Sequence, residues 1–82
     1  MNMTVYILFS ECKNRYYLGQ TRDIEERLSR HNSGLVKSTK YGMPWKLVYT
    51  ENVLNRSEAL MLERRIKKRG AKRFIDNHKF GV

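Results

Sequence analysis

Two polar side chains on the core-facing side of a predicted helix are the first candidates for chemistry in this sequence. At 3.6 residues per turn, Arg27 and His31 fall within about 100° of Ile24 and Leu28, on the face that would pack against a core. A guanidinium offers paired donors to phosphate, and an imidazole exchanges a proton near neutral pH. The pattern indicates either a site for an anionic substrate or two edge residues that bury their stems and keep their polar ends in water.

Glu63 is a second polar residue within an apolar stripe. It falls among Ala59, Leu62 and Ile66 on a later predicted helix, where an unpaired carboxylate is costly. One explanation is an i,i+4 pair with Lys67 at the edge of the stripe, and the other is a function that needs the charge. One carboxylate alone is too few to argue for a metal site.

Three segments that could position these residues have the composition of β-strands. Residues 3–9 form an apolar run rich in β-branched and aromatic types, which predicts a central strand covered on both faces. Residues 16–20 resume strand character after the polar turn at 11–15, so the first twenty residues form a predicted hairpin. Residues 45–50 alternate, which places Trp45, Leu47 and Tyr49 on one side of a third strand.

The length of the hairpin turn decides which side chains face each other. If Lys13 and Asn14 form a two-residue turn, Tyr6 and Tyr17 point to the same face of the sheet. A three-residue loop would reverse that relation.

Two helices are predicted from their start signals, an Asp or Asn followed three residues later by Glu. The first helix covers residues 24–32 after Asp23. The second covers about 56–69 after Asn55 and ends at Gly70, because glycine readily adopts the backbone conformation that terminates a helix.

The remaining segments carry weaker signals. Residues 33–44 have no sustained period, two glycines and two lysines, so we predict a mobile basic loop. A short helix over residues 71–77 would dock Phe74 or Ile75 on the core, and the tail to Val82 is predicted to be loose.

Together these elements predict an α/β (α+β) fold, in which a small, mainly antiparallel three-stranded sheet is flanked by helices. We expect one domain over residues 1–82, since 82 residues approach the lower limit for a single core. No apolar run approaches the roughly 20 residues of a membrane span, and no signal-peptide order is visible, so we expect a cytoplasmic protein without a membrane partner. The lone Cys12 excludes an internal disulfide and argues against structural zinc.

Charge is the strongest bulk signal. The chain has 17 Lys and Arg against 8 Asp and Glu, a net charge of +9, and the excess concentrates in residues 56–73. Nucleic acid is the expected partner, with anionic surfaces as an alternative that rests on charge alone. Tyr41 or Trp45 could stack on an unpaired base, although a tryptophan at a strand start more often belongs to the core. The candidate backbone contacts are Lys37, Lys40, Arg64, Lys67, Lys68 and Lys72.

These separate features resemble one known family, the GIY-YIG nucleases. The similarity covers about residues 4–77 and is most specific in the YLG triplet followed by TRDIEERLSRHN, with further support from SEALMLERRIKK. The chain looks most like the small stand-alone bacterial members. The residues that carry the resemblance are Tyr6, Tyr17, Gly19, Arg27, His31 and Glu63.

The sequence departs from the family pattern at aliphatic positions. Thr4 and Val5 replace the Gly and Ile of the first triplet, and Leu18 replaces the Ile of the second, while both tyrosines and Gly19 remain. Better characterised relatives also append a DNA-binding domain that this chain has no room for. Specificity would then come from a protein partner.

The resemblance implies metal-dependent hydrolysis of a phosphodiester bond in DNA. Arg27 would neutralise the phosphoryl oxygens, and Glu63 would hold one Mg²⁺ or Mn²⁺ ion that assists the departing 3′ oxygen. The attacking water would lose its proton to the Tyr6 hydroxyl, assisted by His31, and the sequence does not rank these two as the base. Tyr17 would orient the water or the phosphate.

Two further residues complete the implied site. Gly19 would let backbone approach closely, and Asn77 matches the family's Asn near the C-terminal end, although an exposed asparagine at a helix end is the simpler interpretation. The rival hypothesis is a nucleic-acid-binding module or repair adaptor of the same fold with negligible turnover.

Overall fold

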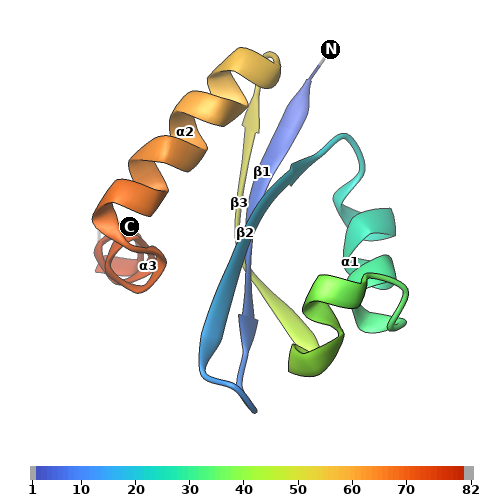
Figure 1. Ribbon diagram of the computed structural model, residues 1–82. Coiled ribbons are helices and arrows are strands. Elements are labelled where there is room, and N and C mark those ends of the chain that lie inside the picture. Colours follow the sequence, from blue (N-terminus) through green and yellow to red (C-terminus); the bar gives the residue numbers. More distant parts are fainter. Residues whose placement is uncertain (1, 81–82) are drawn as a thin grey trace.

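The fold is built around a three-stranded antiparallel sheet. The computed structural model describes residues 2–80, the last three by their backbone alone. In chain order the elements are β1 (Met3–Ser10), β2 (Arg15–Thr21), α1 (Ile24–Asn32), the 3-10 helix η1 (Lys37–Gly42), β3 (Trp45–Val53), α2 (Arg56–Arg69) and α3 (Ala71–Phe80). The strand order is β2-β1-β3, with α1 and η1 on one face and α2 and α3 on the other (Figure 1). The predicted fold class is confirmed.

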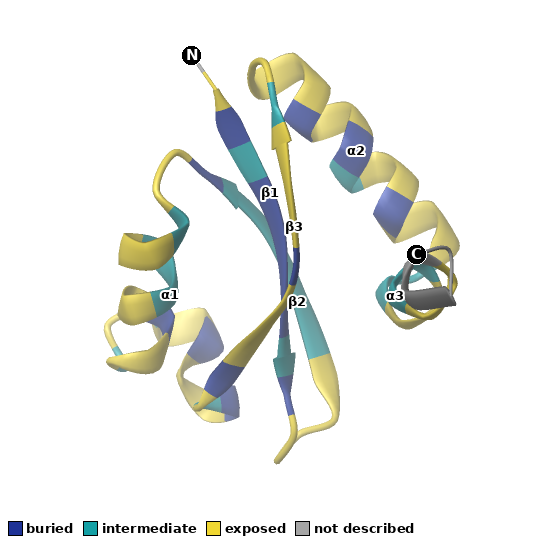
Figure 2. Cartoon of the chain, turned by 180° about the vertical axis from the view of Figure 1, so that it is seen from behind, coloured by how far each residue is buried: buried dark blue, intermediate teal, exposed yellow. Residues whose placement is uncertain are grey.

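Strand β1 is central and buried along most of its length, as its apolar run predicts (Figure 2). Its side chains alternate between two cores. Val5 and Ile7 belong to the core beneath α2 and α3, whereas Tyr6 and Leu8 belong to the core beneath α1. Tyr6 therefore lies on the opposite face of the sheet from α2.

The hairpin places the two tyrosines on one face. In the β1–β2 register Tyr6 pairs with Gly19 and Leu8 pairs with Tyr17, so Tyr6 and Tyr17 point the same way, which is one of the two relations considered for this hairpin. Neither of the two loop lengths considered is found, because Ser10 pairs with Arg15 and the connection has four residues. Loops of two and of four residues both contain an even number of residues, so both leave Tyr6 and Tyr17 on the same face of the sheet.

One side-chain assignment on β3 is wrong. The β1–β3 register shifts between Ile7 and Leu8, so that Ile7 pairs with Tyr49 while Leu8 pairs with Leu47. Such an irregularity moves every later side chain to the other face. Tyr49 consequently packs in the α2 core, whereas Trp45 packs in the α1 core, and the three residues do not share one side.

The segment between α1 and β3 is more structured than predicted. Instead of a loop without regular structure, residues 37–42 form the 3-10 helix η1, in which Thr39 and Gly42 are buried. Trp45 Nε1 donates to the Thr39 carbonyl oxygen at 2.7 Å. A Cβ on Gly42 would lie 2.4 Å from Trp45 Cζ2, so only glycine permits this contact. Packing against Trp45, the first residue of the next strand, holds η1 in place, and no periodicity within residues 37–42 reveals it.

Both predicted helix starts are confirmed. Asp23 Oδ1 accepts from the Glu26 backbone N–H at 3.1 Å, and Asn55 Oδ1 accepts from the Glu58 N–H at 3.0 Å. Helix α2 ends at Gly70 with φ of +93°.

Helix α3 also confirms its docking prediction, since Phe74 and Ile75 both pack against the α2-side core. It is longer than predicted because it continues to Phe80. Residues 81 and 82 of the predicted loose tail lie outside the described residues. Within the described chain, each helix is too short or too polar to cross a membrane.

Candidate active site

The candidate site forms at β2, an edge strand of the sheet. Tyr6 projects from the central strand across its partner Gly19, and a Cβ on Gly19 would lie 2.6 Å from the Tyr6 hydroxyl oxygen. The phenol therefore lies against backbone where any other residue would place a side chain. Gly19 thus opens the path by which the Tyr6 hydroxyl reaches the edge of the sheet.

A chain of hydrogen bonds connects Tyr6 with α1 and η1. The Tyr6 hydroxyl lies 3.1 Å from His31 Nε2, and His31 Nδ1 lies 2.8 Å from Thr39 Oγ1. All three side chains are only 1% exposed. His31 is therefore not an edge residue with a wet ring, and both of its nitrogens have protein partners.

The direction of these bonds follows from the single proton of the threonine hydroxyl. Thr39 Oγ1 donates to the Val36 carbonyl oxygen at 3.3 Å, so toward His31 it acts as an acceptor. Nδ1 of His31 then carries the proton, and Nε2 presents a lone pair. The Tyr6 hydroxyl donates to that lone pair, which leaves the phenol oxygen free to accept.

Burial and neighbouring charges affect the two partners in opposite directions. Burial raises the pKa of the Tyr6 phenol to about 12, Tyr17 and Glu63 raise it as well, and the Arg27 guanidinium opposes the increase by charge and hydrogen bonding. Burial lowers the pKa of His31, and the positive charges of Arg27 and Arg30 lower it further. At neutral pH Tyr6 is a protonated phenol and His31 a neutral imidazole.

The His31 shift predicts a measurable dependence of stability on pH. The unfolded chain protonates His31 near pH 6.5, whereas the folded chain resists protonation, so the free energy of unfolding should fall as the pH drops below about 6.5. Urea titrations at pH 7.5 and 5.5 should show a larger loss for wild type than for His31→Gln. Equal losses in the two proteins would contradict a buried, neutral His31.

Tyr17 lies beside this chain but does not extend it. Its ring centroid is 4.9 Å from that of His31 and 6.3 Å from that of Tyr6. Its other neighbour is Trp45, at 6.2 Å in an edge arrangement. Tyr17 is half-buried, so its ring packs against the histidine while part of the residue remains accessible to solvent.

Arg27 completes the α1 side of the site. The residue is half-buried, and its Nε atom is buried without a hydrogen-bond partner among the described residues. The positive charge of its guanidinium lowers the pKa of the Tyr6 phenol. An unsatisfied guanidinium donor beside a phenol is suited to an anion that arrives with acceptor oxygens.

Glu63 approaches the same strand from the other face. Gln20 Nε2 donates to Glu63 Oε2 at 2.5 Å, and Gln20 immediately follows Gly19 on β2. The carboxylate forms no ion pair with Lys67 within the described part of the chain, so the pairing considered from the sequence is wrong. Because its charge raises the pKa of Tyr6, Glu63 is electrostatically coupled to the phenol around the edge of the sheet.

Comparison with known proteins identifies the family. The description "GIY-YIG catalytic domain" matches residues 2–77. The chain belongs to the GIY-YIG family. This assignment confirms the resemblance drawn from the two tyrosine motifs and the α1 sequence.

Several GIY-YIG relatives of this chain are small bacterial or archaeal UPF0213 proteins. One from Streptococcus pneumoniae serotype 4 is 35% identical over 84% of this chain and 72% of its own length. One from Staphylococcus saprophyticus is 44% identical, covering 76% and 78% respectively. The solution NMR structure of a UPF0213 protein from Bacillus halodurans matches 98% of this chain and 85% of its own, with 30% identity and a TM-score of 0.58.

GIY-YIG nucleases generally depend on a divalent metal, and the donors near Glu63 fit one hard cation. One carboxylate oxygen accepts from Gln20, and the buried Gln20 Oε1 has no hydrogen-bond partner among the described residues. No group of three His, Cys, Asp or Glu side chains that could hold a metal occurs in the described chain. The donors therefore suit an ion that takes most ligands from water and phosphate, as Mg²⁺ does.

The remaining predicted residues are not gathered at this GIY-YIG site. Asn77 is exposed on α3, and its amide, oriented with the oxygen toward Arg69, accepts from that guanidinium. Trp45 is core, at 3% exposed, and Tyr41 is the exposed aromatic beside it. The predicted backbone contacts are all exposed and occupy η1, α2 and α3: Lys37, Lys40, Arg64, Lys67, Lys68 and Lys72.

Sequence reasoning missed two polar residues of the GIY-YIG site, Thr39 and Gln20. Thr39 has no local signal, since it lies eight residues after His31 in a segment without periodicity. Gln20 could have been found, because strand alternation places the residue after Gly19 on the face opposite Tyr6, where Glu63 needs a donor.

Proposed function

We propose that this chain is a metal-dependent endonuclease or nicking enzyme that hydrolyses phosphodiester bonds in DNA, acting as one domain in the cytoplasm, in repair or recombination. The observation that carries the proposal is the hydrogen-bond chain from Tyr6 through His31 to Thr39, next to an unsatisfied Arg27 donor. A buried proton relay beside an anion-binding group is what attack by water on a phosphodiester requires.

His31 is the base in this mechanism, and Tyr6 relays the proton. With a pKa near 12 the Tyr6 phenol is not ionised at neutral pH. It can therefore accept a proton from water only while it donates its own proton to another group. As water attacks, its proton passes to the Tyr6 oxygen while the Tyr6 proton passes to His31 Nε2. The Thr39 acceptor keeps the other ring nitrogen protonated, so Nε2 is available for this step.

Arg27 and Glu63 act on the phosphate in this mechanism. The Arg27 guanidinium binds the phosphoryl oxygens and offsets the negative charge that develops during attack. A bound Mg²⁺ or Mn²⁺ ion would supply Lewis-acid assistance to the departing 3′ oxygen. Glu63 would hold it, and Gln20 orients the Glu63 carboxylate by donating to one oxygen.

A cleavage assay with the wild-type chain tests this proposal. Nicked, flapped, branched and linear DNA, with RNA counterparts, would be incubated with and without Mg²⁺ or Mn²⁺. We expect metal-dependent cleavage of at least one DNA substrate, with a 3′ hydroxyl at the cut. Binding that weakens steeply with salt but no cleavage of any substrate would favour the nucleic-acid-binding module. A flat salt response would remove nucleic acid as the partner.

Thr39→Val tests the assigned proton positions. Valine preserves most of the volume but removes the acceptor for His31 Nδ1–H, so the preferred protonation of the ring is lost. We expect the cleavage rate to fall by roughly 10-fold with little change in DNA affinity. Thr39→Ser keeps the hydroxyl and should restore most of the rate, which a purely steric role for Thr39 would not explain.

A further inference from the structure

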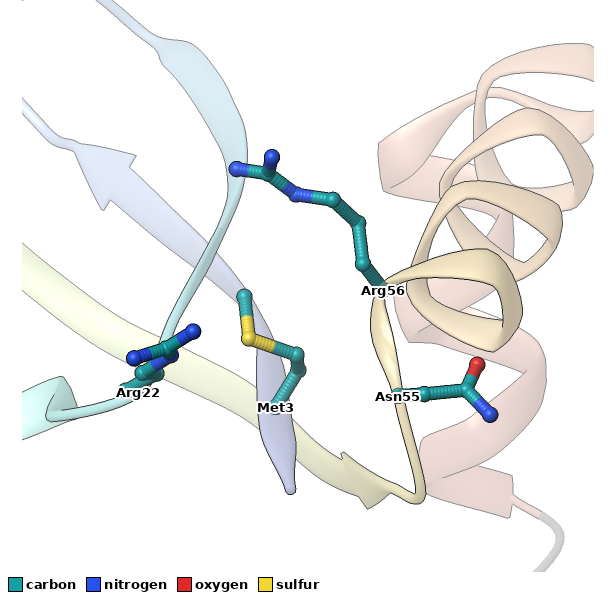
Figure 3. A pocket seen from close by; sticks show the side chains of 4 residues that line it. All are labelled: Met3, Arg22, Asn55 and Arg56. Carbon is teal, nitrogen blue, oxygen red and sulfur yellow. The ribbon is translucent and has the colours of Figure 1, made fainter. Parts of the chain in front are cut away.

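A cavity between the start of β1, the end of β2 and the start of α2 has two arginines in its wall. Its volume is about 370 Å³, and it is lined by Met3, Arg22, Asn55 and Arg56. Arg22 directly follows β2 and Arg56 is the first residue of α2, so two separate elements supply the guanidinium groups. Arg56 extends from α2 past the end of Met3, Arg22 lies on the other side of Met3, and the Asn55 amide turns away from both (Figure 3).

No carboxylate neutralises these two arginines. Neither forms a salt bridge within the described residues, and none of the lining residues is acidic. The start of α2 is not itself the binding group, because Asn55 Oδ1 accepts from the Glu58 N–H and Glu58 Oε1 accepts from the Leu54 N–H. The cavity therefore offers unpaired guanidinium donors, and these donors match phosphate oxygens.

Both arginines lie near the Gln20–Glu63 contact along the chain. Arg22 lies two residues after Gln20, and Arg56 lies seven residues before Glu63. Seven residues are almost two helical turns, so Arg56 and Glu63 share one side of α2 about 10 Å apart. This separation is well above the 3.4 Å axial rise per nucleotide of one DNA strand, so Arg56 and Glu63 would meet different phosphates.

We propose that this cavity binds a second backbone phosphate of the DNA strand, distinct from the phosphate that is cut. The ligand assignment rests on the proposed function, and the anion site itself rests on the cavity and its two arginines. Such a contact fixes the direction in which the strand crosses the site without reading its sequence. It would also hold the strand to both elements that supply the metal-side residues, β2 and α2.

DNA binding without metal tests the proposal, because no turnover is needed. The variant R22Q/R56Q would be compared with K13Q/R15Q, which removes the same charge from exposed residues at the other end of β2. At 0.1 M salt we expect R22Q/R56Q to bind DNA roughly 5- to 10-fold more weakly than wild type, and the affinity of the control to change less than twofold. The slope of the logarithm of the binding constant against the logarithm of the salt concentration should become smaller by about one for R22Q/R56Q. Equal losses in both variants would overturn the proposal.

Inorganic phosphate provides a second test that does not depend on a variant or on DNA. Titrated into the full chain, it should shift the Nε–H signals of Arg22 and Arg56 together and leave that of Arg15 in place. If phosphate binds there but no DNA is cleaved, the proposed function fails while the anion site stands. If DNA is cleaved but neither arginine signal shifts and R22Q/R56Q binds like the control, the second phosphate site is wrong.

Discussion

Replacing Glu63 by glutamine is expected to lower metal-dependent cleavage by on the order of 10²- to 10³-fold while leaving metal-free DNA affinity within about twofold. The carboxylate is half-buried and bonded to Gln20, and a glutamine oxygen can still accept that bond, so the local structure should persist. The variant removes the negative charge, which an amide does not replace as a ligand for a hard cation. Rates and affinities on one DNA substrate, with and without Mg²⁺, measure both effects.

Glu58→Gln is the matched control for this experiment. Glu58 lies on the same helix, is exposed, and accepts from the Leu54 N–H at 2.9 Å, so the substitution changes the same charge away from the site. Mn²⁺ should broaden the Gln20 side-chain amide signals in wild type and Glu58→Gln but not in Glu63→Gln. Wild-type cleavage by Glu63→Gln would remove this residue from the mechanism.

The elements with local signals were predictable from the sequence. Helices α1 and α2 begin where an Asp or Asn side chain accepts from the N–H three residues later, an interaction decided within four residues. The central position of β1 follows from its apolar run alone, since a strand buried on both faces has no polar alternation. These signals do not depend on how the rest of the chain packs.

The errors have causes outside the segments that were interpreted. The side occupied by Tyr49 depends on an irregularity in the β1–β3 pairing, which residues 45–50 do not encode by themselves. The helix η1 depends on the contact of Gly42 and the Thr39 carbonyl with Trp45. In both cases the deciding partner lies on another element.

The candidate site was predictable only where its residues carry a local signal in the sequence. Arg27 and His31 stand out because they are polar at core positions of a periodic helix, and Glu63 because it interrupts an apolar stripe. The sequence left open whether Tyr6 or His31 is the base. Spatial neighbours provide the argument for His31, because the role of its ring depends on Thr39, which lies outside every periodic segment.

Gly19→Ala is expected to cost about 1–3 kcal/mol of stability and to lower the cleavage rate of the folded fraction by roughly 10²-fold. The added Cβ would lie 2.6 Å from the Tyr6 hydroxyl oxygen and 2.7 Å from Cζ, closer than packed atoms tolerate. Tyr6 is 1% exposed and bonded to His31, so relieving the contact moves the phenol away from its proton acceptor. Urea unfolding and single-turnover cleavage measure the two losses.

Gly70→Ala separates loss of stability from loss of geometry. Gly70 has φ of +93° and nothing within 4 Å of an added Cβ, so alanine there is strained at the end of α2 without touching Tyr6. Both alanine variants should therefore be less stable than wild type, but only Gly19→Ala should lose activity once rates are corrected for the folded fraction.

Adding Tyr6→Phe to Gly19→Ala should recover part of the lost stability, because the 2.6 Å contact with the hydroxyl oxygen disappears. The double variant should recover none of the cleavage, because the proton relay is gone. A Gly19→Ala protein with wild-type stability and rate would show that the Tyr6 hydroxyl does not lie against β2.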